Sequence, residues 1–450
     1  MRPRSKDKGT VLRDFGDGLI LRRATKADTE ALAAFNCEIH CGPGSEDRPE
    51  WITAWTRDLM SGDHPTFKPG DFTVVEDIKT RAIVSALCLI PQTWSYEGIK
   101  IGVGLPDLVG TTPKYRRRGL VRAQFEVIHD WSARRNHMLQ AITGIPNFYR
   151  QFGYEMAVEE YGGRTGFKPD VPKLKKGEKE PYRVRPAAEG DLPFIARIHR
   201  RGTLRYLLSC VRSPAVWRYE FDGRRRDALL RQELRVIESA GGERVGFLAH
   251  ESRLWGNGIG ASVYELKPGA SWLTVTPSVV RYLAAAGEKY AARQKKELAT
   301  FGFSLGTEHP VYKVIPGRLP RLSDPYALYV RVPDVPGFLR RIAPVLERRL
   351  AESVAVGHTG ELKLSFYREG VRMAFRKGRL REVEAWTPGR PGEAESAAFP
   401  GLTFLHLLFG HRSLEELEGS YADCYGAEDE AKLLLNVLFP KRPSCVWKLG

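Results

Sequence analysis

Residues 113–121 read PKYRRRGLV, in which three consecutive arginines lead directly into a glycine. The residues before them, 108–112, are the apolar and β-favouring stretch LVGTT, and residues 121–135 have the spacing of an amphipathic helix. A strand, a basic turn with a glycine and a helix start together suit a phosphate, because the first N–H groups of a helix are unpaired and its dipole favours an anion. The alternative is an exposed basic loop, and only the surrounding sequence can distinguish it from a phosphate-binding loop.

The chain has 450 residues, which predicts about three domains. Its 42% hydrophobic and 28% charged residues are typical of a globular protein, and its apolar runs are shorter than the ~20 residues of a membrane span. The basic N-terminus is not followed by an apolar segment, so we expect a cytoplasmic protein without a membrane partner. The net charge of +16 favours an anionic partner but does not distinguish nucleic acid from a phosphate-rich cofactor.

The six cysteines are scattered along the chain and do not form a disulfide framework. Cys37, His40 and Cys41 have the spacing of one helix face, but no fourth ligand stands at the distance that a zinc site requires. We therefore expect ordinary helix packing here and no metal site.

The same order of sequence elements begins twice, once on either side of a charged, proline-containing stretch at 168–183. Residues 19–35 and 182–198 are each a short strand, a polar turn and an apolar-periodic helix. Aligning Asp28 with Asp191 sets an offset of 163 residues (191 minus 28). Two matches at this offset, the second described below, predict a duplicated domain.

The second match pairs Tyr149 with Tyr312, but the second copy lacks the basic loop. The offset carries Gly119 to Tyr282, within WLTVTPSVVRYLAAA (272–286), where we expect a strand and a helix. The glycines of the second copy lie instead in WGNGIGA (255–261), which we interpret as a tight turn between strands.

A third α+β domain is predicted after Asp324. Residues 326–350 contain a strand and a proline-started helix, and two alternating apolar runs at 362–366 and 371–375 are joined by a hairpin signal. Short helical stretches follow at 404–410 and 429–439.

The order of these elements in the first domain resembles the GNAT superfamily of acetyl-CoA-dependent N-acyltransferases. Arg116-x-x-Gly119-x-Val121 matches the family's phosphate-loop pattern of Gln/Arg-x-x-Gly-x-Gly/Ala except at Val121. Residues 147–154, NFYRQFGY, match its later helix and strand. Two motifs in the correct order are more informative than either alone.

The resemblance implies acetyl-CoA as the cofactor. The amides around Arg117 would bind the diphosphate, where Gly119 lets the backbone approach, and residues 109–111 would pair with the pantetheine arm. The residues expected to bind the cofactor are Val109, Gly110, Thr111, Arg116, Arg117, Arg118, Gly119, Leu120, Val121 and Asn147.

Catalysis in this family is direct attack of an amine on the thioester. The resemblance assigns Tyr149 as the residue that protonates the leaving thiolate, with a buried structural tyrosine as the alternative. The second copy, without the basic loop, is expected to be inactive.

The three-part layout is similar to acetyltransferases of the enhanced-intracellular-survival (Eis) type. This predicts an α/β (α+β) fold with a catalytic GNAT domain (1–170), a linker (171–182), a degenerate GNAT-like domain (183–324) and a sterol-carrier-protein-like domain (325–450). It also implies a homo-oligomer and a small-molecule amine acceptor, such as an aminoglycoside, a polyamine or lysine.

The same resemblance implies that the chain's terminal carboxylate, on Gly450, enters the active site, with Asp107 as the alternative base. Glu155 is a further acid that could attract a cationic amine. Trp51 and Trp55, one helical turn apart, could line the substrate pocket or belong to the core.

Two other functions compete with the transferase. The first is a lipid- or ligand-binding protein that uses the C-terminal domain, although such a carrier would not need the basic loop or Tyr149. The second is a nucleic-acid binder, which we do not expect because the basic residues are dispersed and not interleaved with aromatic residues.

Overall fold

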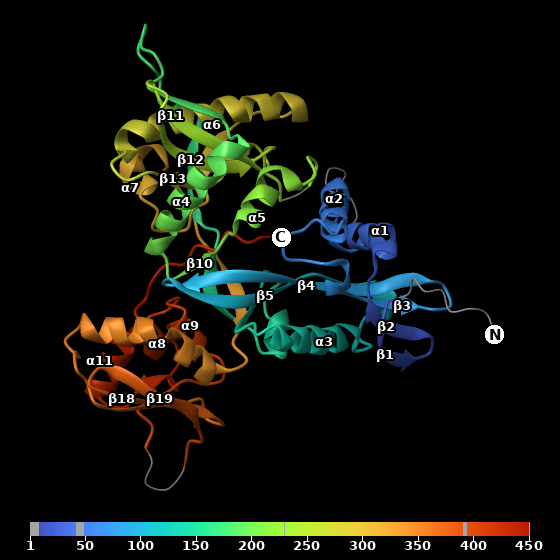
Figure 1. Cartoon of the computed structure of the whole chain (residues 1–450), viewed down its shortest axis with the longest axis vertical. Helices are drawn as coiled ribbons and strands as arrows, with labels where there is room; N and C mark the ends of the chain where they lie inside the picture. Colours follow the sequence, from blue (N-terminus) through green and yellow to red (C-terminus); the bar gives the residue numbers. More distant parts are fainter. Residues whose placement is uncertain (1–8, 42–48, 229, 390–393, 450) are drawn as a thin grey trace.

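The computed structural model describes residues 9–41, 49–228, 230–389 and 394–449. Within these residues the chain forms three β-sheets, and the units built on them are stacked with the first sheet in the middle (Figure 1). The first two sheets each combine antiparallel pairs with a parallel pair, so the predicted mixed α/β fold class is confirmed. No helix in the described ranges has the length and apolar character needed to cross a bilayer.

The first sheet has the order β1-β2-β3-β4-β5-β6-β16-β7, and β10 pairs with one end of β4. Helices α1 and α2 lie on one side of the long β4–β5 hairpin and α3 on the other (Figure 1). The strands are Val11–Gly16 (β1), Leu19–Arg23 (β2), Phe72–Asp77 (β3), Ala82–Tyr96 (β4), Ile99–Thr111 (β5), Leu139–Ile142 (β6), Glu155–Glu160 (β7), Leu208–Cys210 (β10) and Tyr326–Arg331 (β16). The helices are Thr29–Cys41 (α1), Pro49–Met60 (α2) and Leu120–Arg134 (α3).

The second sheet has the order β15-β8-β14-β13-β12-β11-β9. Its strands are Gly163–Phe167 (β8), Tyr182–Pro186 (β9), Gln232–Ser239 (β11), Arg244–Glu251 (β12), Gly258–Leu266 (β13), Thr300–Phe303 (β14) and Arg321–Ser323 (β15). The helices of this unit are Leu192–Gly202 (α4), Pro214–Arg218 (α5), Trp272–Gln294 (α6) and Val311–Val314 (α7). The predicted tight turn at 255–261 is present, because Trp255 and Gly258 exchange both backbone hydrogen bonds at 3.0 Å.

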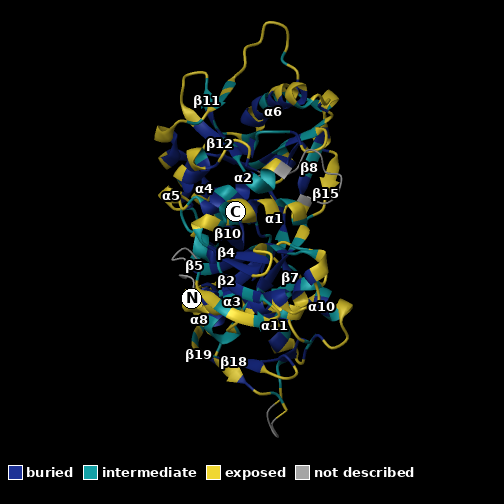
Figure 2. Ribbon diagram, turned by 90° about the vertical axis from the view of Figure 1, so that its right-hand side faces the viewer, coloured by how far each residue is buried: buried dark blue, intermediate teal, exposed yellow. Residues whose placement is uncertain are grey.

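The third sheet has the order β19-β18-β17-β20-β21, and the hairpin predicted between 362–366 and 371–375 is confirmed. Its apolar residues form one continuous core with the first sheet, so these units are not separated by solvent (Figure 2). The strands are Gly360–Ser365 (β17), Gly370–Arg376 (β18), Arg379–Trp386 (β19), Ala397–Ala398 (β20) and Tyr425–Gly426 (β21). The helices are Val335–Ala351 (α8), Phe404–Leu408 (α9), Leu414–Ser420 (α10) and Asp429–Leu438 (α11).

The first two sheets exchange a strand across the boundaries proposed at residues 170 and 324. β8 precedes the linker but pairs with β14 and β15 of the second sheet. β16 follows residue 324 but lies between β6 and β7 of the first sheet. The linker therefore does not separate two independent sheets.

The two aspartates that were aligned at the offset of 163 residues lie in similar turns. Arg22 pairs with Asp28 at 2.7 Å, and Arg185 pairs with Asp191 at 2.7 Å. In both copies the aspartate also accepts the amide three residues before it, at 2.7 and 2.8 Å. Each ion pair fixes the turn between the strand that carries its arginine, β2 or β9, and the following helix.

The strand expected within 272–286 is wrong, because these residues belong to helix α6. Its β-branched residues favour a strand locally, but Val275, Val279 and Leu283 are spaced by one helical turn and are fully buried. Packing against the second sheet therefore overrides the local propensity.

Candidate active site

The basic loop ends at the N-terminus of α3. Gly119 is the N-cap of this helix with a φ of 74°, and no protein atom lies within 4 Å of where its Cβ would be. The first hydrogen bond inside the helix runs from the amide of Ala123 to the carbonyl oxygen of Gly119 at 3.0 Å, so the amides of 120–122 have no acceptor within the helix. The arginines at 116–118 are exposed around these amides. Together they form a positively charged cradle that fits a diphosphate.

The predicted loop residues contribute in different ways. The side chain of Leu120 is buried and that of Val121 is half-buried against the core, so these two residues contribute only their backbone amides to the loop. Asn147 lies elsewhere, as the exposed N-cap of the 3-10 helix η4 (Phe148–Phe152), with a φ of 66°.

Strand β5 has a β-bulge shortly before the loop. Ala86 is opposite Gly110 whereas Cys88 is opposite Asp107, so one residue of β4 faces the two residues 108–109 of β5. On its other edge β5 pairs with β6 through 103–104, and in the described chain this pairing does not continue beyond Gly104. The edge of β5 that contains Val109, Gly110 and Thr111 is therefore available to an extended ligand.

Gly110 also has a packing role. A Cβ at this position would lie 2.7 Å from Cγ2 of Ile39, so the glycine lets α1 approach β5 closely. Substitution of Gly110 would disturb this helix contact as well as any ligand.

Tyr149 lies in η4 with its side chain 6% exposed. Its ring packs against Phe125 and Tyr329, and a Cβ at Gly144 would lie 2.0 Å from its Cε2, so the ring occupies the space that this glycine leaves. Within the described residues its hydroxyl makes no hydrogen bond. Burial, and then the negative charge of Asp107, raise the pKa of Tyr149, so the hydroxyl keeps its proton at neutral pH.

The exchanged strand β16 supports the segment that carries Tyr149. Tyr326 donates its hydroxyl to the carbonyl oxygen of Gly144 at 2.8 Å, and Tyr329 donates to that of Ile145 at 3.2 Å. The position of the candidate acid thus depends on residues far along the chain.

A cavity of about 710 Å³ lies between the first sheet, the second sheet and the C-terminal residues 444–448. This volume suits a small molecule. The charged residues in its lining are Asp107, Glu220, Arg224, Glu251 and Lys448.

Asp107 lines this cavity at the start of the bulge, half-buried, and its Oδ1 accepts the amide of Leu108 at 2.7 Å. Burial raises the pKa of Asp107, and the positive charge of Lys448 opposes this increase. Asp107 is therefore a stronger base than an exposed aspartate.

Lys448 forms an ion pair with Glu160, which is buried and also accepts the Thr143 hydroxyl at 2.7 Å. Burial alone would lower the pKa of Lys448, but Glu160, Tyr161 and Asp107 outweigh it and raise the pKa. The lysine therefore remains charged beside Asp107.

The C-terminal segment reaches the cavity from the third unit along β10. Cys445 donates its amide to Leu208 at 3.0 Å, and the side chain of Gln92 donates to the carbonyl oxygen of Leu449. Leu449 is buried against Val216. Gly450, the predicted source of a catalytic carboxylate, lies outside the described residues.

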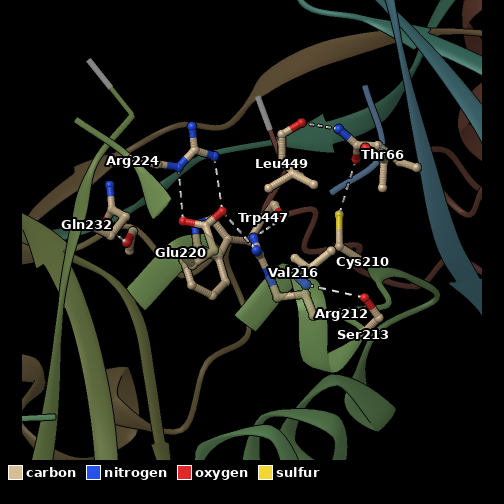
Figure 3. Close-up of polar contacts among 12 residues, drawn as sticks. Thr66, Cys210, Arg212, Ser213, Val216, Glu220, Arg224, Gln232, Trp447 and Leu449 are labelled. Atoms are coloured by element: carbon tan, nitrogen blue, oxygen red, sulfur yellow. Dashed lines mark hydrogen bonds and ion pairs between the residues drawn. The ribbon is translucent and has the colours of Figure 1, made fainter. Parts of the chain in front are cut away.

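An ion-pair cluster that the sequence analysis missed anchors this segment. Glu220 accepts from Arg212 at 3.0 Å and from Arg224 at 3.1 Å, and all three side chains are at most 2% exposed. Arg212 also donates to the carbonyl oxygen of Trp447 at 2.7 Å and stacks on its ring (Figure 3). Arg224 belongs to the run GRRRD, which resembles an exposed charged loop, so composition gave no signal of its burial.

Of the two predicted pocket tryptophans, both in α2, Trp55 lines the cavity. Trp51 instead packs edge-to-face against Trp255, which does line it, at 5.3 Å between ring centroids. Glu155 is paired with Arg150 at 2.7 Å and His406 at 3.7 Å, away from the cavity lining.

Comparison with known proteins identifies the first domain. Residues 21–157 match the family model described as an acetyltransferase (GNAT) domain, so this part of the chain is similar to domains of that family. No curated protein gives a significant match to the sequence.

Similar solved structures extend over nearly the whole chain. A probable N-acyltransferase from Enterococcus faecalis V583 has 14% identity and a TM-score of 0.65, covering 96% of this chain and 100% of its own. A GCN5-related N-acetyltransferase from Kribbella flavida has 14% identity and a TM-score of 0.62, covering 96% and 98%. Eis1 from Mycobacterium abscessus has 12% identity and a TM-score of 0.57, covering 94% and 98%. At these identities the similarity establishes the fold.

Proposed function

We propose that the GNAT domain transfers an acetyl group from acetyl-CoA to a primary amine bound in the cavity between the first two sheets. The observation that carries this proposal is the position of Asp107. Its carboxylate lines the cavity, it begins the bulge of β5, and its charge reaches Tyr149. Asp107 therefore connects the proposed acceptor site with the β5 edge proposed for the cofactor and with the candidate acid Tyr149.

The loop and the bulged strand are the proposed cofactor site. The free amides after Gly119 and the arginines at 116–118 would hold the diphosphate, and the open edge at 109–111 would align the pantetheine arm. Acetyl-CoA, when bound, supplies the thioester whose acetyl group is transferred.

The proton transfers are assigned to this chain's own groups. An acceptor enters as an ammonium ion, and Asp107 accepts its proton at the carboxylate, aided by a raised pKa. The terminal carboxylate of Gly450 is the alternative base, since the segment up to Leu449 lies beside the cavity. The amine nitrogen bonds to the acetyl carbon as the carbon–sulfur bond breaks, and the hydroxyl of Tyr149 donates its proton to the leaving thiolate. The second proton that the nitrogen loses on becoming an amide restores this hydroxyl.

A lipid-carrier role for the third unit has less support. Its interior is packed with aromatic rings, among them Phe404, whose ring contacts those of Phe366 and Phe439 at 5.5 and 5.4 Å. We therefore prefer the transferase.

The test is release of free coenzyme A from acetyl-CoA in the presence of aminoglycosides, polyamines, lysine peptides and aryl amines, with calorimetry of acetyl-CoA binding alongside. We expect tight cofactor binding and amine-dependent turnover, both lost on Gly119→Glu. A folded protein that does not bind acetyl-CoA would contradict the proposal.

A further inference from the structure

Glu251 is a cavity residue with no role in the chemistry above. It ends strand β12 of the second sheet and is half-buried in the cavity lining, whereas Asp107 comes from the first sheet. In the described part of the chain, its carboxylate makes no hydrogen bond and no ion pair. Glu220 in the same lining is instead paired with two arginines, so it is not available to a cationic ligand.

Aromatic residues accompany this carboxylate. Trp255 and Trp55 line the cavity with Glu251, and Trp255 is 45% exposed. Trp51 fixes the indole of Trp255 by an edge-to-face contact at 5.3 Å. Indole rings and a carboxylate in the lining of one cavity can attract an organic cation by both cation–π and ionic interactions.

Arg253, two residues after Glu251, contacts other groups. The guanidinium of Arg253 lies 4.1 Å above the ring of Trp51 and donates to the carbonyl oxygen of Asp227 at 3.2 Å. Burial raises the pKa of Glu251 to about 7, with the charge of Arg253 opposing. A cation placed next to Glu251 would therefore favour its ionised form and gain an ion pair in a partly dry site.

We infer that Glu251 and Trp255 bind a second ammonium group of the acceptor, so that the enzyme prefers amines with two positive charges. This inference rests on the proposed transferase function. Asp107, on the first sheet, accepts the proton of the reacting amine. Glu251, on the second sheet, binds the distant ammonium group of the same acceptor. The distance between the two walls then selects the length of the acceptor.

The test compares α,ω-diaminoalkanes from three to eight carbons with the n-alkylamines of the same lengths. For the wild-type enzyme we expect kcat/KM at the best diamine length to exceed that of the matching monoamine at least about tenfold. Glu251→Gln should remove most of this difference by raising KM for the diamine, with kcat and monoamine kinetics unchanged. Calorimetry of diamine binding to the protein saturated with coenzyme A should show the same loss without turnover.

Glu297→Gln is the matched control, because Glu297 is exposed and lies outside the cavity lining. It should leave both kinds of acceptor unaffected. Equal loss of diamine and monoamine activity in Glu251→Gln, or no loss for either, would overturn the inference while leaving the transferase intact. A wild-type protein that binds acetyl-CoA but acetylates neither these amines nor those of the wider acceptor screen would overturn both.

Discussion

The hydroxyl of Tyr312 donates a hydrogen bond to the carbonyl oxygen of Phe303 at 2.9 Å. It also accepts the amide of Leu305 at 3.2 Å. Tyr149, which stands at the corresponding position 163 residues earlier in the chain, has no hydrogen bond from its hydroxyl within the described residues. The hydroxyl of Tyr312 therefore stabilises the local structure, whereas that of Tyr149 is available for the proton transfer proposed above.

Replacing Tyr149 by phenylalanine should lower kcat about 100-fold or more, because one proton donor is lost. The affinity for acetyl-CoA should change little, since the ring keeps its place above Gly144. Steady-state kinetics with calorimetry of acetyl-CoA binding measure both effects. Near-normal turnover of the variant would mean that Tyr149 has only a structural role in the core.

Tyr312→Phe should have the opposite profile. It leaves the buried carbonyl of Phe303 and amide of Leu305 without their partner, which should cost about 1–3 kcal/mol of unfolding free energy. Urea unfolding measures this loss, and kcat should remain within about twofold of wild type because Tyr312 does not line the cavity. A large fall in kcat in a folded variant would reveal a second active site.

Much of the local structure could be predicted because it is encoded by adjacent residues. The strand, basic turn and helix around Gly119 have local signals, namely a β-favouring run, a residue with free φ and an amphipathic repeat. The strand exchange could not be predicted, because alternation in β8 or β16 specifies a buried face and not the sheet that supplies it. This is why boundaries at 170 and 324 do not follow the sheets.

The residues that line the cavity could not be predicted from the sequence either. Asp107 could be proposed as a base because it is an acidic residue close in sequence to the expected cofactor strand, but Glu251 lies in a separate unit and belongs to no motif. Its importance depends on burial and on the absence of a partner among the described residues, and both come from packing. The buried cluster around Glu220 has the same origin, since charged residues are usually exposed.

Gly119→Glu should abolish binding of coenzyme A without unfolding the protein. The new carboxylate would occupy the space over the α3 amides and repel a diphosphate, while no protein atom is displaced. Gly242→Glu is a suitable control, because Gly242 also has a positive φ of 80° and open space around its Cβ. Calorimetry should show no binding for the first variant and normal binding for the second. Equal affinity in both would mean that the loop is not the phosphate site.

Lys448→Met should move the acidic limb of the pH–activity profile to higher pH. If Asp107 is the base, it must lose its proton to act, so kcat/KM rises with pH through its pKa. The charge of Lys448 lowers the pKa of Asp107, so removing this charge raises that pKa. At pH values just above the wild-type midpoint, the variant should therefore be less active, and both enzymes should converge at higher pH.

The same substitution leaves Glu160 buried without its cation, which could weaken the fold. The double variant Glu160→Gln with Lys448→Met removes both charges and should show a smaller shift in the same direction, because Lys448 lowers the pKa of Asp107 more than Glu160 raises it. Lys441→Met, which breaks an ion pair of the same C-terminal segment outside the cavity lining, should leave the profile unchanged. An acidic limb that stays in place in both cavity variants would exclude Asp107 as the base and favour the carboxylate of Gly450.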